Sequence, residues 1–254
     1  MEQGNKIALV TGASRGLGKN MALNLAEQGT DVIVIYRSKE QEAQQVVGTI
    51  EGMGRKSIAM QLDTANTKSF DAFFTELQAV LESKWSRKTF DFLINNAGID
   101  ANSKFADTTE DDFDALMNVH FKGVYFLTQK ALPYIADNGR IINLSTGLTR
   151  FATPGYAAYA SMKGAIEVLT KYLAKELGYR GITVNLVAPG IIHTDFTKQA
   201  FAAHPGLEDH MNSITALGRV GEPQDIGAVV AFLCTEGARW INAQRIEASG
   251  GMNL

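Results

Sequence analysis

The sequence predicts a single α/β domain with a doubly wound parallel sheet and helices on both of its faces. Short apolar runs that end in glycine or polar clusters recur along the chain, and helical segments separate most of them. Such alternation is typical of parallel strands joined by right-handed crossovers. The length of 254 residues suits one large domain with a substantial core. We therefore expect residues 1–254 to form one unit.

Seven apolar runs are the expected strands: residues 7–10, 31–36, 57–62, 92–94, 141–144, 182–187 and 245–248. Helical patterns cover residues 16–28, the region near 39–52, and a long stretch that begins near Tyr159 and passes Leu169. Ligands of open parallel sheets bind at the carboxyl ends of the strands. Polar and glycine motifs follow several of these ends, so we expect the functional site at that edge of the sheet.

The turn after the first strand is rich in glycine. Residues 12–18 read Gly-Ala-Ser-Arg-Gly-Leu-Gly, directly before the first predicted helix. Glycine lets a backbone approach a ligand closely, and the free NH groups at a helix N-terminus bind pyrophosphate. A glycine turn alone is a weak signal, but its place after the first strand favours a nucleotide site. The residues expected to contact it are Gly12, Ser14, Arg15, Gly16, Leu17 and Gly18.

The end of the second strand predicts which dinucleotide binds. An acidic residue there would bind the 2′-hydroxyl of NAD, but this chain has Tyr36, Arg37 and Ser38. Arg37, together with Arg15, could hold a 2′-phosphate through charge-assisted hydrogen bonds. We therefore expect NADPH or NADP+ rather than NADH, with exposed arginines that bind no ligand as the alternative.

Tyr159 and Lys163 lie four residues apart in the long predicted helix, so their side chains share one face. A phenol titrates near pH ~10, and a neighbouring cation lowers its pKa. A tyrosine tuned in this way can pass a proton to a carbonyl oxygen. An isolated pair at this spacing is more often an ordinary surface pair, so the surrounding motifs decide between the two interpretations.

Composition narrows the classes of function. The net charge of -3 gives no reason to expect nucleic acid or an anionic membrane as a partner. No metal is expected, because the four histidines lack Cys or His partners at zinc-like spacing. Cys234, the one cysteine, lies in an apolar run and is expected to be buried. The polar residues 1–6 show no leader sequence, and no stretch reaches the length of a membrane span, so we expect a cytoplasmic protein.

Over nearly its whole length the chain resembles the short-chain dehydrogenase/reductase family. Residues 11–18 match the family's T-G-x-x-x-G-x-G, residues 95–98 its N-N-A-G, and residues 159–163 its Y-x-x-x-K. The resemblance implies a Rossmann-like sheet of seven strands, a nicotinamide cofactor, a small-molecule carbonyl substrate, and a homotetramer or homodimer. Further positions that match the family's pattern are Asn118, Pro189, Gly190 and Thr194.

The resemblance also implies roles for individual residues. Tyr159 would be the proton donor, and Lys163 would lower the pKa of Tyr159 and bind the nicotinamide ribose. Asn118 would hold a water molecule in the proton relay, and Asp63 would meet the adenine. The expected cofactor contacts also include Asn95, Ala97, Gly98, Pro189, Gly190, Ile192 and Thr194, in addition to Tyr159 and Lys163.

One position departs from the family's pattern. Thirteen residues before Tyr159, where the family usually has serine, stands Thr146, with Ser145 just before it. Threonine keeps the hydroxyl that would donate to the substrate oxygen, although its methyl group restricts χ1. We expect Thr146 to take the serine's role, because strand alternation turns Ser145 to the other face.

The substrate remains open at this point. Residues 193–215 are the expected substrate lid. Side chains that could form an apolar pocket for a ketone are Leu148, Phe151, Tyr156, Phe196 and Phe201. Within the family the chain also resembles 3-oxoacyl-acyl-carrier-protein reductases, whose acidic carrier would need a basic docking patch. A cofactor-binding regulator without turnover is the alternative from another class.

Overall fold

A computed structural model describes residues 5–100 and 102–254. All seven strands lie in one sheet, and every pair of neighbouring strands is parallel. The strand order is β3-β2-β1-β4-β5-β6-β7. The strands are β1 (Ile7–Val10), β2 (Asp31–Tyr36), β3 (Ser57–Gln61), β4 (Phe90–Asn95), β5 (Ile135–Leu144), β6 (Thr183–Pro189) and β7 (Arg245–Ala248). The expected single α/β domain with a seven-stranded parallel sheet is confirmed.

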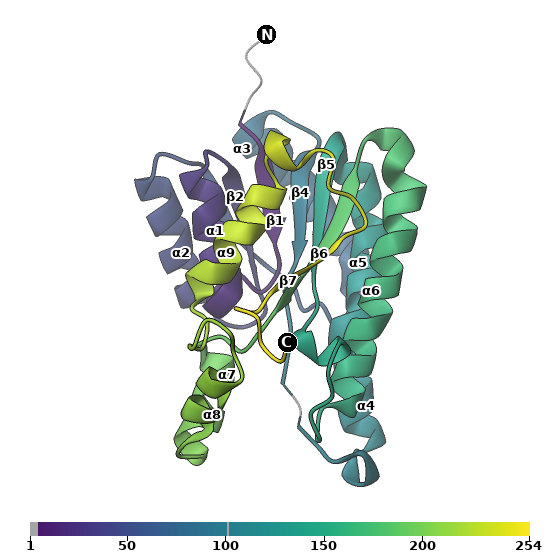
Figure 1. The fold of residues 1–254 in the computed structure, drawn as a ribbon. Coiled ribbons are helices and arrows are strands. Elements are labelled where there is room, and N and C mark those ends of the chain that lie inside the picture. The colour runs from purple at the N-terminus through teal and green to yellow at the C-terminus, as the bar shows by residue number, and fades with distance from the viewer. Residues whose placement is uncertain (1–4, 101) are drawn as a thin grey trace.

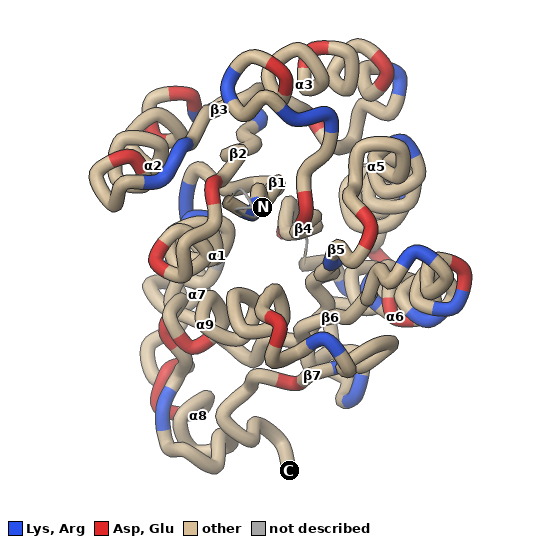
Figure 2. Tube along the Cα trace, turned by 90° about the horizontal axis from the view of Figure 1, so that it is seen from above, with Lys and Arg blue, Asp and Glu red and all other residues tan. Residues whose placement is uncertain are grey.

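The α-helices of the described residues are α1 (Gly16–Glu27), α2 (Glu40–Gly52), α3 (Phe70–Trp85), α4 (Glu110–Met117), α5 (Gly123–Ala131), α6 (Ala157–Leu177), α7 (Asp195–Ala203), α8 (Leu207–Ser213) and α9 (Pro223–Leu233). A π-helical turn, Asn118–Lys122, joins α4 to α5. Helices α1, α2 and α9 cover one face of the sheet and α3, α5 and α6 cover the other, as Figures 1 and 2 show.

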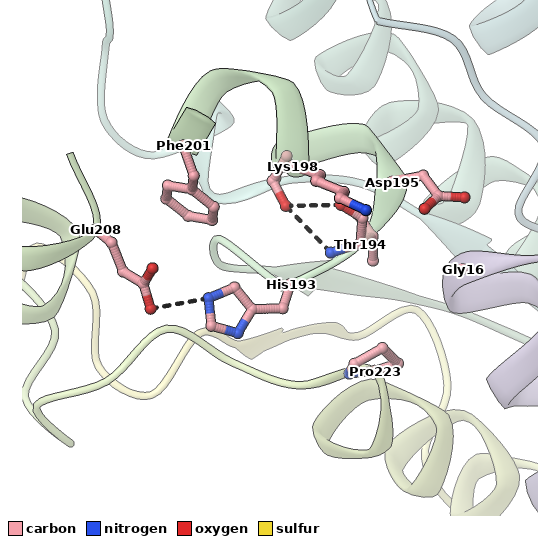
Figure 3. A pocket seen from close by; sticks show the side chains of 9 residues that line it. Gly16, His193, Thr194, Asp195, Lys198, Phe201, Glu208 and Pro223 are labelled. Atoms are coloured by element: carbon pink, nitrogen blue, oxygen red, sulfur yellow. Dashed lines mark hydrogen bonds and ion pairs between the residues drawn. The ribbon is translucent and has the colours of Figure 1, made fainter. Parts of the chain in front are cut away.

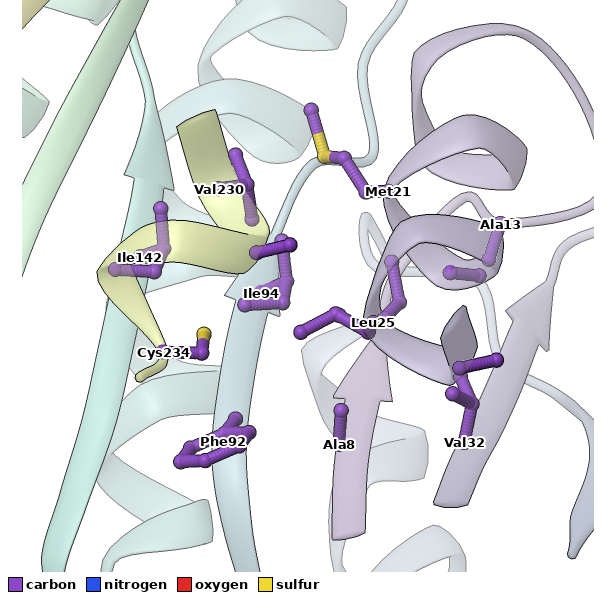
Figure 4. Close-up of a cluster of buried hydrophobic side chains, with 14 of the residues drawn as sticks. Ala8, Ala13, Met21, Leu25, Val32, Phe92, Ile94, Ile142, Val230 and Cys234 are labelled. Atoms are coloured by element: carbon purple, nitrogen blue, oxygen red, sulfur yellow. The ribbon is translucent and has the colours of Figure 1, made fainter. Parts of the chain in front are cut away.

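Two buried clusters fill the space between the sheet and the helices. Side chains alternate along a strand, so Ala8 and Val10 pack under α1 and α9 while Ile7 and Leu9 face α3 and α5. Figure 4 shows the first cluster, with Met21 and Leu25 of α1 over β1 and β4. Cys234 belongs to it, and burial raises the pKa of its thiol to about 12. The thiol is therefore a packing group, as expected.

The predicted boundaries agree with the structure except at irregular strand ends. β1, β2 and β7 begin and end where the sequence indicates, and β3 ends one residue earlier, at Gln61. β4 (Phe90–Asn95) is longer than the predicted 92–94, and β6 (Thr183–Pro189) begins one residue later and ends two residues later than predicted. β5 begins at Ile135, six residues earlier than predicted, because Ile135 pairs with Phe90 before a register shift. Asn138 in this irregular segment has a φ of 61°. A polar residue with a left-handed backbone conformation interrupts the apolar run from which a strand is predicted, so the start of β5 is not visible in the sequence.

Three helices extend beyond the carboxyl edge of the sheet. In Figure 1, α7 and α8 lie on one side of this edge and α4 lies on the other. The strand-end motifs at residues 11–18, 95–98 and 145–146 lie at the same edge, because all the strands are parallel. The fold therefore brings together the groups that the sequence singles out.

Candidate active site

The glycine turn is clamped to the loop after β4. Thr11 Oγ1 accepts hydrogen bonds from the backbone NH groups of Asn96 (2.9 Å) and Ala97 (3.0 Å). In return, Asn96 Nδ2 donates to the carbonyl oxygens of Thr11 (2.8 Å) and Gly12 (3.2 Å). The glycine turn and the loop at residues 95–98 are thus one hydrogen-bonded unit.

The glycines of this turn have distinct reasons to be glycine. Gly12 and Gly16 have φ values of 63° and 56°, a region that side chains with a Cβ disfavour. A Cβ on Gly18 would lie 2.2 Å from the Gly12 carbonyl oxygen and 2.5 Å from Asn96 Nδ2. The first turn of α1 is therefore packed against the glycine turn with no room for a side chain, while its N-terminus stays accessible at Ser14, Gly16 and Leu17.

The two arginines expected at a 2′-phosphate differ in their surroundings. Arg37 is exposed and makes no ion pair with any residue that the structure describes, so it is available to an anionic ligand. Arg15 pairs with Asp195 of α7, with 3.6 Å between Nη1 and Oδ2. Ser38 and Asp63 are exposed nearby, and Asp63 Oδ1 accepts from the NH of Ala65. Arg37 is therefore the stronger candidate for phosphate contact.

The side chain of Asn95, one of the expected cofactor contacts, is bonded inside the protein. Its side chain is buried, and its Nδ2 donates to Asn143 Oδ1 (2.8 Å) and to Thr128 Oγ1 (3.0 Å). Asn143 Nδ2 in turn donates to Thr170 Oγ1 (2.9 Å). Asn95 sits on the interior side of the strand, so this amide ties β4 and β5 to α5 and α6 instead of facing a ligand. Ala97 and Gly98, in the loop beyond it, remain candidates.

Tyr159 and Lys163 share one face of α6, as predicted from their spacing. Lys163 Nζ lies 5.8 Å from the centroid of the Tyr159 ring and donates to the carbonyl oxygen of Leu144 at 2.8 Å. Leu144 ends β5, so this bond fixes the helix to the strand that also carries Thr146. Lys163 is buried, and burial lowers the pKa of its ammonium to about 8.

The predicted lowering of the Tyr159 pKa does not appear in this structure. Burial raises the pKa of Tyr159 above its ordinary value, and the negative charges of Asp100 and Tyr156 add to the increase. Desolvation is the largest of these causes, because it disfavours the charged phenolate. Tyr159 is therefore fully protonated at neutral pH.

Ser145 and Thr146 point in different directions. Ser145 is buried, and its hydroxyl donates to Glu167 Oε1 (2.8 Å). Thr146 is partly exposed, and its Oγ1 accepts from the NH of Leu148 at 3.3 Å. Arg245 holds this strand end by donating to Glu167 Oε1 (2.9 Å) and to the Thr146 carbonyl oxygen (3.1 Å). Ser145 and Thr146 therefore have different surroundings, and the role of Thr146 as hydroxyl donor stays a prediction.

In the turn after α4, the contact with Tyr159 comes from His120. Asn118 begins the π-helical turn, and no hydrogen bond of its side chain to a described residue is found. The ring of His120 lies edge to face on Tyr159, with 5.0 Å between centroids. The relay role of Asn118 stays a prediction. No sequence motif includes His120, and only its place two residues after Asn118 could have drawn attention to it.

A cavity of about 400 Å³ lies between the glycine turn and the expected lid, and Figure 3 shows its lining. Gly16, Thr194, Lys198, Phe201 and Pro223 are among the residues around it. His193 crosses one side: its Nδ1 lies 2.8 Å from Glu222 and its Nε2 lies 3.1 Å from Glu208 of α8. Glu222 is the main cause of a raised His193 pKa. This His193 clasp, the contact of His193 with Glu208 and Glu222, joins α8 to the start of α9, and no sequence motif indicates it.

Hydrogen bonds and close packing hold the segment between β6 and α7 in place. Gly190 donates its NH to the Ala248 carbonyl oxygen (3.2 Å), and a Cβ on Gly190 would lie 2.9 Å from the Cα of Ser249. Ile192 is buried, and its carbonyl oxygen accepts from Thr197 Oγ1. Thr194 caps α7, with its NH bonded to the same hydroxyl. The segment from Pro189 to Thr194 therefore forms a fixed platform beside the cavity.

The expected apolar pocket is only partly assembled. Phe201 lines the cavity and lies edge to face on His193, with 5.5 Å between ring centroids. Tyr156 lies near Tyr159 at 6.4 Å between centroids, and Leu148 is partly buried. Phe151 packs against Gly147 and under the guanidinium of Arg150. The side chain of Phe196 lies outside the described part of the chain.

No group of three or more His, Cys, Asp or Glu side chains within residues 5–100 and 102–254 could hold a metal ion. No helix in the same part of the chain is long and apolar enough to cross a membrane.

Comparison with known proteins places this geometry in context. Residues 12–253 match the sequence profile of a family described as "Enoyl-(Acyl carrier protein) reductase". The 3-oxoacyl-[acyl-carrier-protein] reductase FabG of Staphylococcus aureus is 39% identical over 251 residues, which cover 98% of each chain.

Two solved structures are similar over almost the whole chain. The reductase LugOII, which catalyses keto-reduction at C1 during lugdunomycin biosynthesis, has a TM-score of 0.93 and 38% identity, with both chains covered completely. The angucycline C-6 ketoreductase LanV with bound NADP has a TM-score of 0.92 and 38% identity, covering 98% of this chain and 95% of the other.

Proposed function

Because the chain belongs to the short-chain dehydrogenase/reductase family, a family of oxidoreductases, we propose that it reduces a ketone to a secondary alcohol with NADPH. The single observation that carries this proposal is the placement of Tyr159 beside the buried Lys163, next to the strand end that carries Thr146. The cofactor supplies the hydride when it is bound. The chain's own residues supply position, a proton and electrostatic stabilisation.

The described residues fit a dinucleotide with a 2′-phosphate. The tight contact between Gly18 and Gly12 leaves the backbone of the glycine turn open to pyrophosphate at the N-terminus of α1. Exposed Arg37, at the end of β2, offers a cation without a competing partner in the described chain. LanV, 38% identical, holds NADP in its solved structure. These observations favour NADPH over NADH.

The proton chemistry follows from the charges at Tyr159. The phenol stays protonated at neutral pH because burial raises its pKa, so the acid form is ready before a substrate arrives. When the proton leaves for a substrate oxygen, the phenolate forms close to the Lys163 ammonium, which stabilises it. Thr146 Oγ1 would donate to the same substrate oxygen, and Asn118 would hold a water molecule that returns a proton.

A ketone with an apolar group is the substrate class that we favour. Phe201 lines the cavity, and Tyr156 lies beside Tyr159 with 6.4 Å between ring centroids. Both solved relatives are reductases of ketones by their titles. The alternative is a 3-oxoacyl group on a carrier protein, which the 39% identity with FabG supports. Arg180, one of the cations that could dock an acidic carrier, is already bonded to Asp137 at 2.8 Å, which weakens that alternative.

We also propose that the protein works as a homodimer or homotetramer. Val168 and Tyr172 of α6 and Tyr125 and Phe126 of α5 are exposed apolar side chains on neighbouring helices. Such side chains, gathered in one area, mark an interaction surface. A second copy of the chain would cover them.

The test is NADPH and NADH oxidation by the purified protein with a panel of ketones, β-keto esters and a 3-oxoacyl thioester. NADPH-selective turnover of ketones is the expected result, and turnover of the thioester alone would favour the carrier-linked alternative. Tight NADPH binding without oxidation on any substrate would favour a cofactor-binding regulator. Faster oxidation of NADH would contradict the role given to Arg37.

A further inference from the structure

Tyr159, Lys163 and Glu167 follow one another at intervals of four residues along α6, so their side chains share one face of the helix. The second and third of them bind consecutive residues at the end of β5. Lys163 Nζ donates to the carbonyl oxygen of Leu144 (2.8 Å), and Glu167 Oε1 accepts from the hydroxyl of Ser145 (2.8 Å). The helix face that carries the reacting tyrosine therefore also holds the carboxyl end of β5.

Glu167 and Arg245 form an ion pair beside the turn that follows β5. Arg245 Nε lies 2.9 Å from Glu167 Oε1, and Arg245 Nη2 donates to the carbonyl oxygen of Thr146 at 3.1 Å. The hydroxyl of Thr149 lies within hydrogen-bond distance of Glu167 Oε1 (2.6 Å) and of the same carbonyl oxygen (3.0 Å). The peptide group after Thr146 is thus held from β7 and from its own turn, and Glu167 binds both of the groups that hold it.

The backbone of Thr146 sets the direction of its hydroxyl. Thr146 is extended, with a φ of -157° and a ψ of 157°, and it directly precedes the 3₁₀ turn Gly147–Thr149. Its branched side chain has a restricted χ1, so a shift of the backbone carries the hydroxyl with it. This hydroxyl is the group proposed to donate to the substrate oxygen. Contacts that hold the Thr146 peptide therefore also hold the donor.

A second carboxylate binds the other side of Arg245. Arg245 Nη1 lies 2.8 Å from Glu247 Oε2, and Glu247 also pairs with Arg150 at 2.7 Å. The side chains of Glu167, Arg245 and Glu247 are 21%, 23% and 19% exposed. Partial burial raises the pKa of Glu167, but hydrogen bonds from two hydroxyls and from Arg245 outweigh it, so the net pKa lies below its usual value. Removing one member of this partly buried group would leave its partner without a counter-charge.

We propose that Glu167 and Arg245 are positioning residues for the ketone reduction: their ion pair, which joins α6 to β7, fixes the Thr146 peptide and so directs the hydroxyl toward the substrate oxygen. The inference rests on the proposed function. The alternative is an ion pair that only stabilises the fold. The two differ in a Thr146→Ala background, because a pair that acts through the Thr146 hydroxyl has nothing left to position once that hydroxyl is removed.

Single-turnover NADPH oxidation at saturating NADPH and ketone tests the route through Thr146. In Glu167→Ala, we expect the rate to fall at least about tenfold, because a small misplacement of a reacting group is costly to turnover, while NADPH affinity stays unchanged. Glu167→Gln keeps an oxygen that can accept from the hydroxyls of Ser145 and Thr149, so it should lose less. In the Thr146→Ala background, adding Glu167→Ala should lower the rate by less than about twofold.

Glu176→Ala is the matched control for the loss of a carboxylate from α6. Glu176 is exposed and makes no ion pair with any residue that the structure describes, so this variant should keep the full rate. Arg245→Lys tests the other member of the pair. It keeps the positive charge, but one ammonium cannot reproduce the contacts of the guanidinium with Glu167, Glu247 and Thr146, so the rate should fall as in Glu167→Ala. If Glu167→Ala does not fold, Arg245→Lys, alone and with Thr146→Ala, decides the question.

Amide hydrogen exchange of residues 145–151 measures the positioning without a substrate. The NH of Arg150 bonds to the carbonyl oxygen of Gly147 at 2.8 Å in this turn, and its exchange should be faster in Glu167→Ala and unchanged in Glu176→Ala. An unchanged rate of NADPH oxidation in Glu167→Ala, an equal fall of that rate in the Thr146→Ala background, or unchanged exchange would each overturn the proposal. If the original protein reduces no ketone, the proposed function fails, and the exchange still decides whether the pair holds the turn.

Discussion

Gly18→Ala tests the packing of the glycine turn, on which the cofactor site depends. Gly18 lies in the first turn of α1, where alanine would otherwise gain about 1 kcal/mol of helix propensity over glycine. Its new methyl group would lie 2.2 Å from the Gly12 carbonyl oxygen and 2.5 Å from Asn96 Nδ2. Both atoms belong to the hydrogen-bonded clamp between the turn and the loop after β4, so neither can move without breaking it.

The expected magnitude follows from this contact. Overpacking of this kind costs about 1–3 kcal/mol, and the displaced turn no longer fits pyrophosphate. After the helix gain is subtracted, we expect a net loss of up to about 2 kcal/mol in the free energy of unfolding, which corresponds to a fall in Tm of up to about 8 °C at this chain length. NADPH affinity should fall at least about tenfold, which corresponds to about 1.4 kcal/mol.

Gly48→Ala is the matched control for this experiment. Gly48 is also helical, in α2, and a Cβ there would meet no atom within 4 Å. This variant should therefore be as stable as the original protein or more so, with NADPH affinity unchanged. Thermal unfolding and NADPH fluorescence titration measure both quantities. Equal stability and equal NADPH affinity of the two variants would refute the close packing of Gly18.

Three further predictions concern the phosphate contact, the hydroxyl donor and the lid. Arg37→Ala should weaken NADPH binding about tenfold, the lower end expected for an exposed charge-assisted hydrogen bond, and should leave NADH binding unchanged. An equal loss of affinity for both cofactors would show that Arg37 does not contact the 2′-phosphate. Thr146→Ala should reduce kcat about 100-fold, as the loss of one donor to a developing oxyanion does, while Thr146→Ser should retain most of the activity. A larger loss of kcat in Ser145→Ala would show that the hydroxyl donor is Ser145 instead. The carboxylates of Glu222 and Glu208 raise the pKa of His193 in the folded protein above its value of about 6.5 in the unfolded chain. The ion pairs of His193 therefore stabilise the fold fully below about pH 6.5, and this stabilisation is lost as the pH rises through the pKa of the folded state. Limited proteolysis of residues 193–215 should therefore be slower at pH 6 than at pH 8, and the difference should vanish in His193→Gln; an unchanged pH dependence in that variant would contradict the clasp.

Periodicity and strand-end motifs predict the sheet and much of the site. β1 and β2 are continuous apolar runs bounded by turns, so their ends are visible in the sequence. Four-residue spacing places Tyr159 and Lys163 on one helix face, and strand alternation separates Ser145 from Thr146. These features depend on local geometry, and local geometry is what a sequence pattern encodes.

The features that the sequence does not reveal depend on tertiary contacts. The interior direction of Asn95 follows from its partners Thr128 on α5 and Asn143 on β5, which are 33 and 48 residues away. The burial of His120 depends on a π-helical turn, whose extra residue changes the helical phase that spacing arguments assume. The pKa of Tyr159 is set by desolvation, which its distance from Lys163 in sequence does not measure. Each of these required the assembled fold.

In the proposed reaction Tyr159 donates the proton to the ketone. The most direct test compares single-turnover NADPH oxidation by the original protein and by Tyr159→Phe at saturating NADPH. We expect Tyr159→Phe to bind NADPH with unchanged affinity, and we expect its rate of NADPH oxidation with the best ketone to fall at least about 100-fold, as the loss of a general acid does. An oxidation rate in Tyr159→Phe equal to that of the original protein would contradict the assignment of Tyr159 as the proton donor.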